Sequence, residues 1–237
     1  MRRLALILLG LAAPLLVPAP APAQAQAQAR AGHVRLDGVE VRLHPATTQV
    51  VTARHTGGYH ARITFWAERD GRWQRVMRAT DARTGYGGLV PGRLRHQGTG
   101  TTPLGTYDLT SSFGTHARNP AWDLDYRTIR RGDFWVMDNA SDYYNRYRNQ
   151  RQGGFRWWLP TSDANGSERL TDYPSQYEWS IVMGFNTRQV RHRGAGIFLH
   201  VNGSGATAGC VSAPRSFLKR LMGSLDPDQR PVIAVGR

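Results

Sequence analysis

The sequence predicts a mostly β domain (a β-rich α+β fold), an irregular β-sandwich or barrel that carries one or two short helices. Three observations support this fold class. After residue 30, most of the chain consists of short segments rich in β-branched and aromatic residues. Asp-Gly pairs, which favour tight hairpin turns, interrupt some of these segments. Only two segments, 212–225 and 140–150, have a helical character.

The first 29 residues are predicted to be a secretory signal peptide. Arg2 and Arg3 precede an apolar run at 4–17, and small residues with A-x-A spacing follow before residue 30. The run is shorter than the roughly 20 residues that cross a bilayer as a helix. An uncleaved membrane anchor is the alternative. No membrane span is expected after signal removal, and the protein is expected to be secreted or held in the cell wall.

Strands are predicted in order along the rest of the chain. Residues 34–44 read as a hairpin that turns at Asp37-Gly38, so residues 30–47 form either a separate extension or the first hairpin of the domain. The main domain is assigned to residues 48–237. Its predicted strands cover 49–55, 61–79 with a turn at Asp70-Gly71, 102–114, 133–139, 179–186, 196–201 and 231–236.

The stronger helical segment is 212–225, directly after Cys210. Ser212 is suited to cap it and Pro214 suits its first turn. One apolar face is formed by Phe217, Leu218, Leu221 and Met222. The segment 140–150 is weaker, and a loop with one helical turn is its alternative.

The composition limits the classes of partner. The formal net charge is +14, and Lys219 is the only lysine among 31 basic residues. Such a charge favours polyanions, which for an exported protein are anionic wall polymers. Nucleic acid is not expected, because the chain has no zinc-finger spacing, basic helix or RNA-binding aromatic signature.

Cys210 is the only cysteine, and it lies in a segment rich in glycine and small residues. A single thiol in an exported protein is a reactive nucleophile, an intermolecular bridge or an inert buried residue. At the predicted helix start, the helix dipole would lower its pKa, and amides near Gly209 and Cys210 could bind an oxyanion. His200 ends a predicted strand ten positions earlier, within reach as a base. The other histidines are scattered, so no metal site is expected.

These residues also carry a family resemblance. The segment HVNGSGATAGCVS, residues 200–212, resembles the active-site signature of the L,D-transpeptidase catalytic domain, of the YkuD/ErfK type. RHQGTGTTPLGTYDLTSSFG at 95–114 and DFWVMDNASDYYN at 133–145 resemble two earlier blocks of the same family, in the same order. The resemblance extends from about residue 48 to the end and is greatest to secreted actinobacterial members.

The resemblance implies a role for several residues. Cys210 would be the nucleophile, His200 the base and then the acid, and the Val201 carbonyl the group that orients the imidazole. The positions implied in substrate binding are Thr207, Tyr144, Asn145 and Ser212. The chain departs from the family at Val201, where glycine is usual, at Ala208, where many members have a second histidine, and at Ser212, where many have arginine or asparagine.

The function implied by the resemblance is peptidoglycan L,D-transpeptidation, in which a cysteine thioester forms, D-alanine leaves and a 3→3 cross-link results. Stem peptides are then the partners, no cofactor is required, and a monomer is expected. An L,D-carboxypeptidase is the alternative within the enzyme class. From another class, a cell-wall-binding module without activity is also considered. A papain-like peptidase is not favoured, because in that class the cysteine precedes the histidine, whereas here His200 precedes Cys210.

Overall fold

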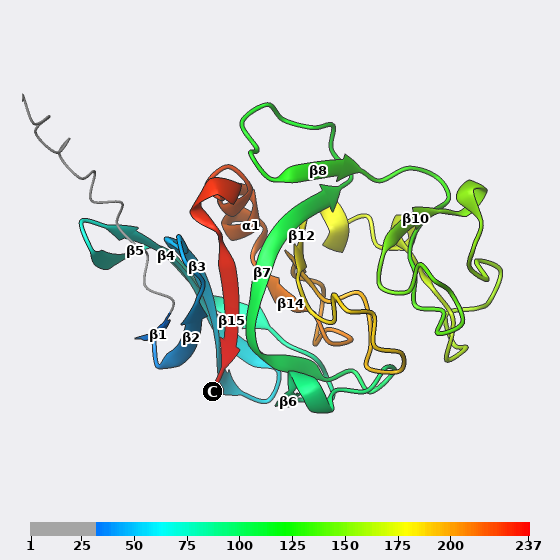
Figure 1. Ribbon diagram of the computed structural model, residues 1–237, viewed down its shortest axis with the longest axis horizontal. Helices are drawn as coiled ribbons and strands as arrows, with labels where there is room; N and C mark the ends of the chain where they lie inside the picture. The colour runs from blue at the N-terminus through cyan, green and yellow to red at the C-terminus, as the bar shows by residue number, and fades with distance from the viewer. Residues whose placement is uncertain (1–31) are drawn as a thin grey trace, which may run out of the picture.

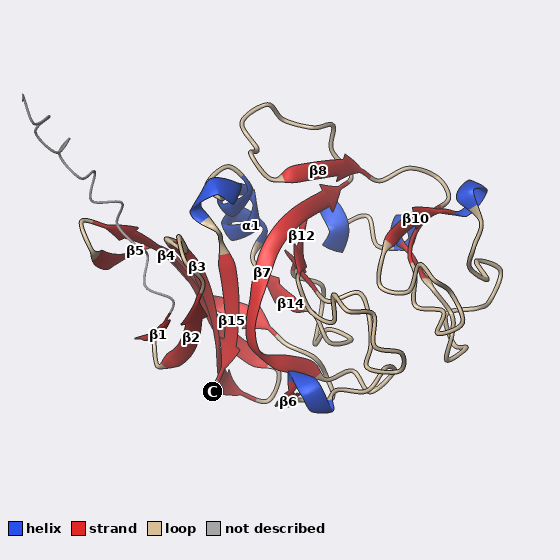
Figure 2. Ribbon diagram, in the orientation of Figure 1, coloured by secondary structure: helices blue, strands red, loops and turns tan. Residues whose placement is uncertain are grey.

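The main sheet closes on itself as a barrel (Figure 1). The computed structural model describes residues 32–237, so the predicted signal peptide lies outside the described residues. The sheet order is β12-β13-β14-β5-β4-β3-β15-β7-β6, and an additional β12–β7 pairing completes the circuit. The fold is therefore mostly β, as predicted (Figure 2).

The strands of the main sheet have the following bounds: β3 (Gln49–Gly57), β4 (His60–Arg69), β5 (Arg72–Arg83), β6 (Leu89–Pro91), β7 (Thr102–Gly114), β8 (Asp125–Thr128), β12 (Ser180–Met183), β13 (Phe198–Val201), β14 (Val211–Ala213) and β15 (Val232–Gly236). β8 lies off the circuit and pairs with β7.

The longest antiparallel run, β3-β4-β5, follows from local sequence signals. On β4, apolar Ala61, Ile63 and Phe65 at alternate positions are buried in the barrel core, as a strand period of two requires. Asp70 and Gly71 join β4 to β5 with φ values of 52° and 72°, which suit a type I′ hairpin turn.

An N-terminal hairpin packs on the outside of the barrel. Its strands are β1 (Gly32–Leu36) and β2 (Val39–Leu43), and the turn is at Asp37-Gly38. Val39 and Val41 are buried against Val50 of β3 and Val232 of β15. The hairpin thus covers the face of these strands that points away from the barrel core.

The α-helix of residues 32–237, α1 (Arg215–Met222), begins three residues later than the sequence suggests. The predicted apolar face is correct, since Phe217, Leu218, Leu221 and Met222 are all buried in the barrel core. The predicted Ser212 cap is wrong. Residues 211–213 pair in parallel with β13 instead, and the Ser212 hydroxyl donates to Asn202 Oδ1 at 2.7 Å.

A smaller sheet, β10-β9-β11, lies beside the barrel. Its strands are β9 (Asp133–Trp135), β10 (Tyr147–Asn149) and β11 (Glu168–Arg169). The weak helix predicted at 140–150 is therefore wrong, and its alternative, a loop, is closer. Residues 142–145 are turns, 147–149 form β10 and Gln150 begins a short 3₁₀ helix at 150–152. No helix among residues 32–237 is long and apolar enough to cross a membrane.

Candidate active site

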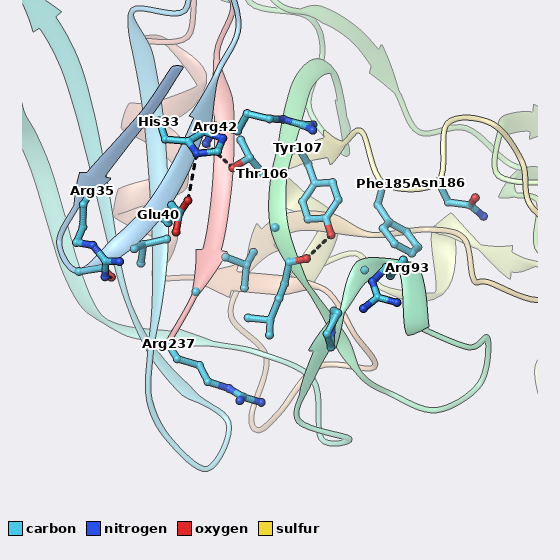
Figure 3. Close-up of a pocket in the computed structure, with 18 of the residues that line it drawn as sticks. His33, Arg35, Glu40, Arg42, Arg93, Thr106, Tyr107, Phe185, Asn186 and Arg237 are labelled. Atoms are coloured by element: carbon cyan, nitrogen blue, oxygen red, sulfur yellow. Dashed lines mark hydrogen bonds and ion pairs between the residues drawn. The ribbon is translucent and has the colours of Figure 1, made fainter. Parts of the chain in front are cut away.

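Cys210 and His200 line the same cavity, of about 540 Å³. Its walls come from residues 95–100, 161–168 and 195–210, with Tyr173, Gln176 and Tyr177 along one side. A larger groove of about 950 Å³ lies between the N-terminal hairpin and β7, and is lined by Arg42, Arg93, Arg237 and other polar residues (Figure 3). That groove contains no thiol, so the smaller cavity is the candidate active site.

The thiol of Cys210 lies in the cavity wall, immediately before β14. Its Sγ accepts a hydrogen bond from the Phe198 amide at 3.3 Å and donates to the Gly196 carbonyl at 3.3 Å. Parallel pairing of β13 with β14 places Leu199 opposite Val211 and His200 opposite Ser212. This pairing brings Cys210, at the start of β14, next to the strand that carries His200, although ten positions separate the two residues.

The environment of Cys210 favours the neutral thiol. Burial raises its pKa to about 12, the charge of Glu168 acts in the same direction, and the Phe198 amide and Arg95 oppose them. The predicted lowering of this pKa by a helix dipole is wrong. α1 begins only at Arg215, after the intervening strand β14, and is too far away to stabilise a thiolate.

His200 is held as a neutral base. Its Nδ1 lies 2.8 Å from the Val201 carbonyl oxygen, which can only accept, so Nδ1 carries the proton and Nε2 is left unprotonated. Burial lowers its pKa to about 4, against the opposing effect of the Val201 contact. The imidazole also meets the ring of Tyr177 edge-on, with 5.5 Å between ring centroids. The branched side chain of Val201 does not prevent the carbonyl contact.

Among the described residues, no hydrogen bond joins the imidazole to the thiol. The thiol proton is directed to the Gly196 carbonyl. Proton transfer to Nε2 therefore requires the thiol to leave that bond and turn toward the imidazole within the shared cavity.

The turn before the thiol requires glycine at position 209. Gly209 has a φ of +130°, and a Cβ there would lie 2.9 Å from the Thr101 carbonyl oxygen. Its amide donates to the Thr207 hydroxyl at 3.1 Å, and that hydroxyl donates to the Cys210 carbonyl at 2.6 Å. Thr207 lines the cavity, but its hydroxyl is used to fix this turn. The Gly209 amide, expected to bind an oxyanion, is likewise engaged.

Tyr144 and Asn145, expected to bind substrate, do not line the cavity. Both are buried, and both support the segment that leads into β13. The Tyr144 hydroxyl accepts from the Gly194 amide at 2.9 Å, and Asn145 Oδ1 accepts from the Gly196 amide at 3.1 Å. Ser212, also expected to bind substrate, is fully buried on β14. Tyr144 and Asn145 position the backbone at 194–196, and the Ser212 hydroxyl contacts the Asn202 side chain.

Sequence reasoning missed the three charged residues that line the cavity, Arg95, Asp163 and Glu168. Arg95 is buried and donates from Nε to the Thr101 carbonyl at 2.7 Å and from Nη1 to the Arg193 carbonyl at 3.3 Å. Glu168 accepts a hydrogen bond from the Tyr177 hydroxyl, and burial raises its pKa to about 7. Arg95 opens the quoted block at 95–114, but Glu168 lies in a polar stretch with no periodicity to single it out.

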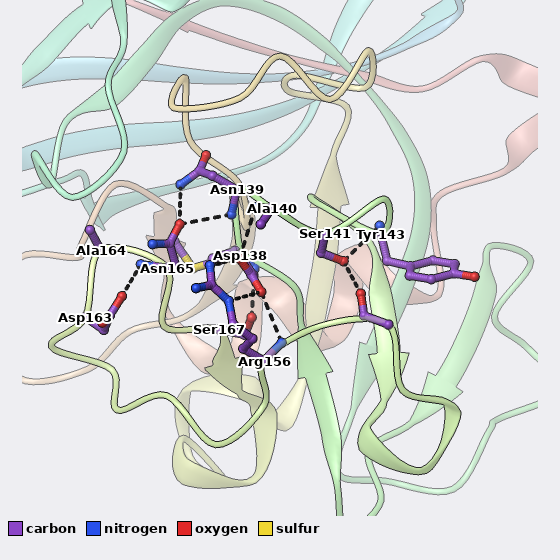
Figure 4. A network of polar contacts seen from close by, with 12 residues as sticks. Asp138, Asn139, Ala140, Ser141, Tyr143, Arg156, Asp163, Ala164, Asn165 and Ser167 are labelled. Carbon is purple, nitrogen blue, oxygen red and sulfur yellow. Dashed lines mark hydrogen bonds and ion pairs between the residues drawn. The ribbon is translucent and has the colours of Figure 1, made fainter.

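The cavity wall at 161–168 is fastened by a polar network (Figure 4). Asp138 accepts hydrogen bonds from Arg156 Nε at 2.9 Å and from the Ala140 amide at 3.0 Å, and the Arg156 contacts hold its pKa at about 2. The Met137 amide donates to Ser167 Oγ at 3.0 Å, next to Glu168. Asp138 therefore ties its own turn, at Ala140, to Arg156.

Residues 32–237 contain no cluster of three or more His, Cys, Asp or Glu side chains that could hold a metal ion. The cavity lining carries the thiol of Cys210, the imidazole of His200 and the carboxyl groups of Asp163 and Glu168.

Comparison with known proteins gives one family match. A family model described as YkuD, the L,D-transpeptidase catalytic domain, matches residues 59–233. No curated protein matches. Among solved structures, the chain is similar to the helical cell shape determining protein Pgp2 (K307A mutant) from Campylobacter jejuni, with 13% identity and a TM-score of 0.41. That similarity covers 79% of this chain and 46% of the other.

Proposed function

Because the chain belongs to the YkuD family of L,D-transpeptidase catalytic domains, we propose that it is an exported peptidoglycan L,D-transpeptidase. The observation that carries the proposal is the placement of the chain's only thiol and a neutral imidazole, with Nε2 unprotonated, on one cavity of about 540 Å³. This is the nucleophile and base pair that cysteine acyl transfer requires.

In the first half-reaction, the Cys210 thiol leaves the Gly196 carbonyl and gives its proton to His200 Nε2. The thiolate attacks the carbonyl carbon of the third, diamino-acid residue of a donor stem peptide. The C–N bond to the terminal D-alanine breaks, the leaving amine takes the proton from His200, and a thioester remains on Cys210. The raised thiol pKa means that the thiolate forms only as the proton is transferred.

In the second half-reaction, a side-chain amine of a neighbouring stem attacks the thioester, and a 3→3 cross-link forms. Water in place of the amine would give L,D-carboxypeptidase activity. The basic N-terminal residues and apolar run support export, and the net charge of +14 supports attraction to anionic wall polymers. We propose that the protein acts as a monomer in the cell wall.

The test is to incubate the purified protein with a disaccharide tetrapeptide and measure the product masses. A dimer that has lost one D-alanine supports transpeptidation, whereas tripeptide alone supports the carboxypeptidase. The Cys210→Ala variant, shown by circular dichroism to be folded, should release no D-alanine. If this variant still releases D-alanine, Cys210 is not the nucleophile. If the wild-type protein binds cell walls but releases none, it is a binding module.

The nucleophile can also be located directly. The family membership supports acylation by a carbapenem, and intact-mass and peptide mapping should find the adduct on Cys210. An adduct on any other residue, or none at all, would contradict the assignment.

A further inference from the structure

Resting on the proposed function, we propose that Glu168 forms a cation subsite of the cavity, which binds the ammonium group of the amine acceptor and removes its proton. Cys210 and His200 perform the acyl transfer in the mechanism above. That mechanism does not say which group binds the charged acceptor amine. Such an amine cannot attack a thioester until it loses a proton.

The charge of the cavity is opposite to that of the protein. The chain has 31 basic and 17 acidic residues, but the lining of the cavity has two carboxyl groups, on Asp163 and Glu168, and one guanidinium, on Arg95. Arg95 is directed to the backbone carbonyls of Thr101 and Arg193. A local acidic surplus within a basic molecule favours a cationic ligand at this place.

Glu168 has room for such a ligand. Its Oε1 accepts a hydrogen bond from the Tyr177 hydroxyl. Its Oε2 receives no hydrogen bond from residues 32–237, and Glu168 forms no ion pair within that part of the chain. Oε2 would lie 3.4 Å from a Cβ built on Gly196, whose carbonyl accepts the thiol proton. The unpaired oxygen thus lies next to the backbone that holds the thiol, and the charge of Glu168 raises the pKa of Cys210. An ammonium group at this place would compensate the buried charge.

The surroundings of Glu168 also suit proton transfer. Burial raises its pKa to about 7, the charge of Asp172 adds to the rise, and the Tyr177 hydroxyl opposes it. The other titratable groups that sense this carboxyl are Tyr173 and Cys210. A base is most effective when its pKa is near the working pH. His200, with a pKa of about 4, is a much weaker base at equilibrium.

The ammonium group gives one proton to the Glu168 carboxylate and becomes a neutral amine. The amine nitrogen attacks the thioester carbon, so a C–N bond forms and the C–S bond breaks. The second proton lost by nitrogen passes through His200 Nε2 to the departing thiolate, which restores the Cys210 thiol. Glu168 then returns its proton to water.

The experiment separates the two half-reactions. Wild-type protein and Glu168→Gln are acylated with the disaccharide tetrapeptide, and the consumption of the thioester is followed by mass with two acceptors. One is Nα-acetyl-lysine amide, whose amine is charged at neutral pH, and the other is hydroxylamine, which is uncharged. We expect Glu168→Gln to acylate no more slowly than wild type, because the charge that it removes raises the pKa of Cys210. The variant should retain transfer to hydroxylamine but lose about 10²-fold in transfer to the lysine derivative.

Two further variants complete the design. Asp123→Asn makes the same acid-to-amide change at an exposed residue outside the cavity lining, and should transfer to both acceptors within about threefold of wild type. Glu168→Asp keeps a carboxylate, and should recover part of the transfer to the lysine derivative. This recovery would show that a loss in Glu168→Gln comes from the missing charge rather than from a disturbed fold.

The outcomes are distinguishable. A Glu168→Gln variant that loses transfer to both acceptors equally, or to neither, overturns the role of Glu168, while thioester formation by the wild-type protein still upholds the proposed function. A wild-type protein that forms no thioester from the donor overturns both.

Discussion

The thiol of Cys210 should react with alkylating reagents far more slowly than a free thiol. Only the thiolate is nucleophilic, and burial raises the pKa of Cys210 to about 12. At pH 7 the thiolate fraction is then ~10⁻⁵, against about 3% for an exposed cysteine with a pKa of about 8.5. The expected rate with iodoacetamide is therefore lower than that of free cysteine by about 3 × 10³-fold.

The measurement uses pH as the perturbation and intact mass as the readout. Cys210 is the only cysteine, so each added mass reports one site. Between pH 6 and pH 10 the rate should rise about tenfold per pH unit without a plateau, since the whole range lies below the pKa. In concentrated urea, where the thiol is exposed, the rate should approach that of free cysteine.

A plateau below about pH 8, or a rate at pH 7 equal to that of free cysteine, would indicate a preformed thiolate paired with an imidazolium. In that case the neutral ground state of Cys210 and His200 would be wrong, and with it the proton transfer described for the first half-reaction.

Asp138→Asn should destabilise the fold by up to about 2 kcal/mol at pH 7 in urea unfolding. Because the pKa of Asp138 is about 2 in the folded state and higher in the unfolded state, the difference in stability between variant and wild type should disappear as the pH falls from about 4 to 2. A difference that persists at pH 2 would contradict the ionic explanation. Gly209→Ala should lower the free energy of unfolding by more than about 2 kcal/mol, because Gly209 has a positive φ and a Cβ there would clash with a backbone oxygen. Gly205→Ala, where neither applies, should lower it by less than about 0.5 kcal/mol. Equal losses in the two variants would refute this explanation. Tyr177→Phe removes the hydroxyl that stabilises the Glu168 carboxylate, so the pKa of Glu168 should rise. In a plot of amine-transfer rate against pH, the acidic limb should then move to higher pH. An unmoved limb would mean that another group titrates.

Local signals account for the parts of the fold that the sequence predicts. The turn at Asp70-Gly71 and the alternation along β4 depend on residues next to each other in the chain, and both are read correctly. The boundary at 211–214 depends on a partner strand instead. Residues 211–213 pair with β13, and this pairing prevents an earlier start of the helix. Periodicity within 212–225 contains no information about that partner.

The candidate site shows the same division. The short glycine-rich loop indicates that His200 and Cys210 lie near each other, and the structure places both on one cavity. Glu168 reaches that cavity from β11, which no local pattern identifies. Tyr144 and Asn145 belong to a block that resembles the family, but a resemblance does not separate residues that touch a ligand from those that support the backbone behind it.

The position of β15 between β3 and β7 has a consequence for how the chain reaches its native state. Residues 232–236 pair with residues 50–54 on one side and with residues 105–108 on the other. Until this stretch pairs, both partner strands have an open edge, and the barrel cannot close. Completion of the barrel is therefore expected to depend on residues 232–236, and proteolytic loss of these five residues should leave an aggregation-prone fragment.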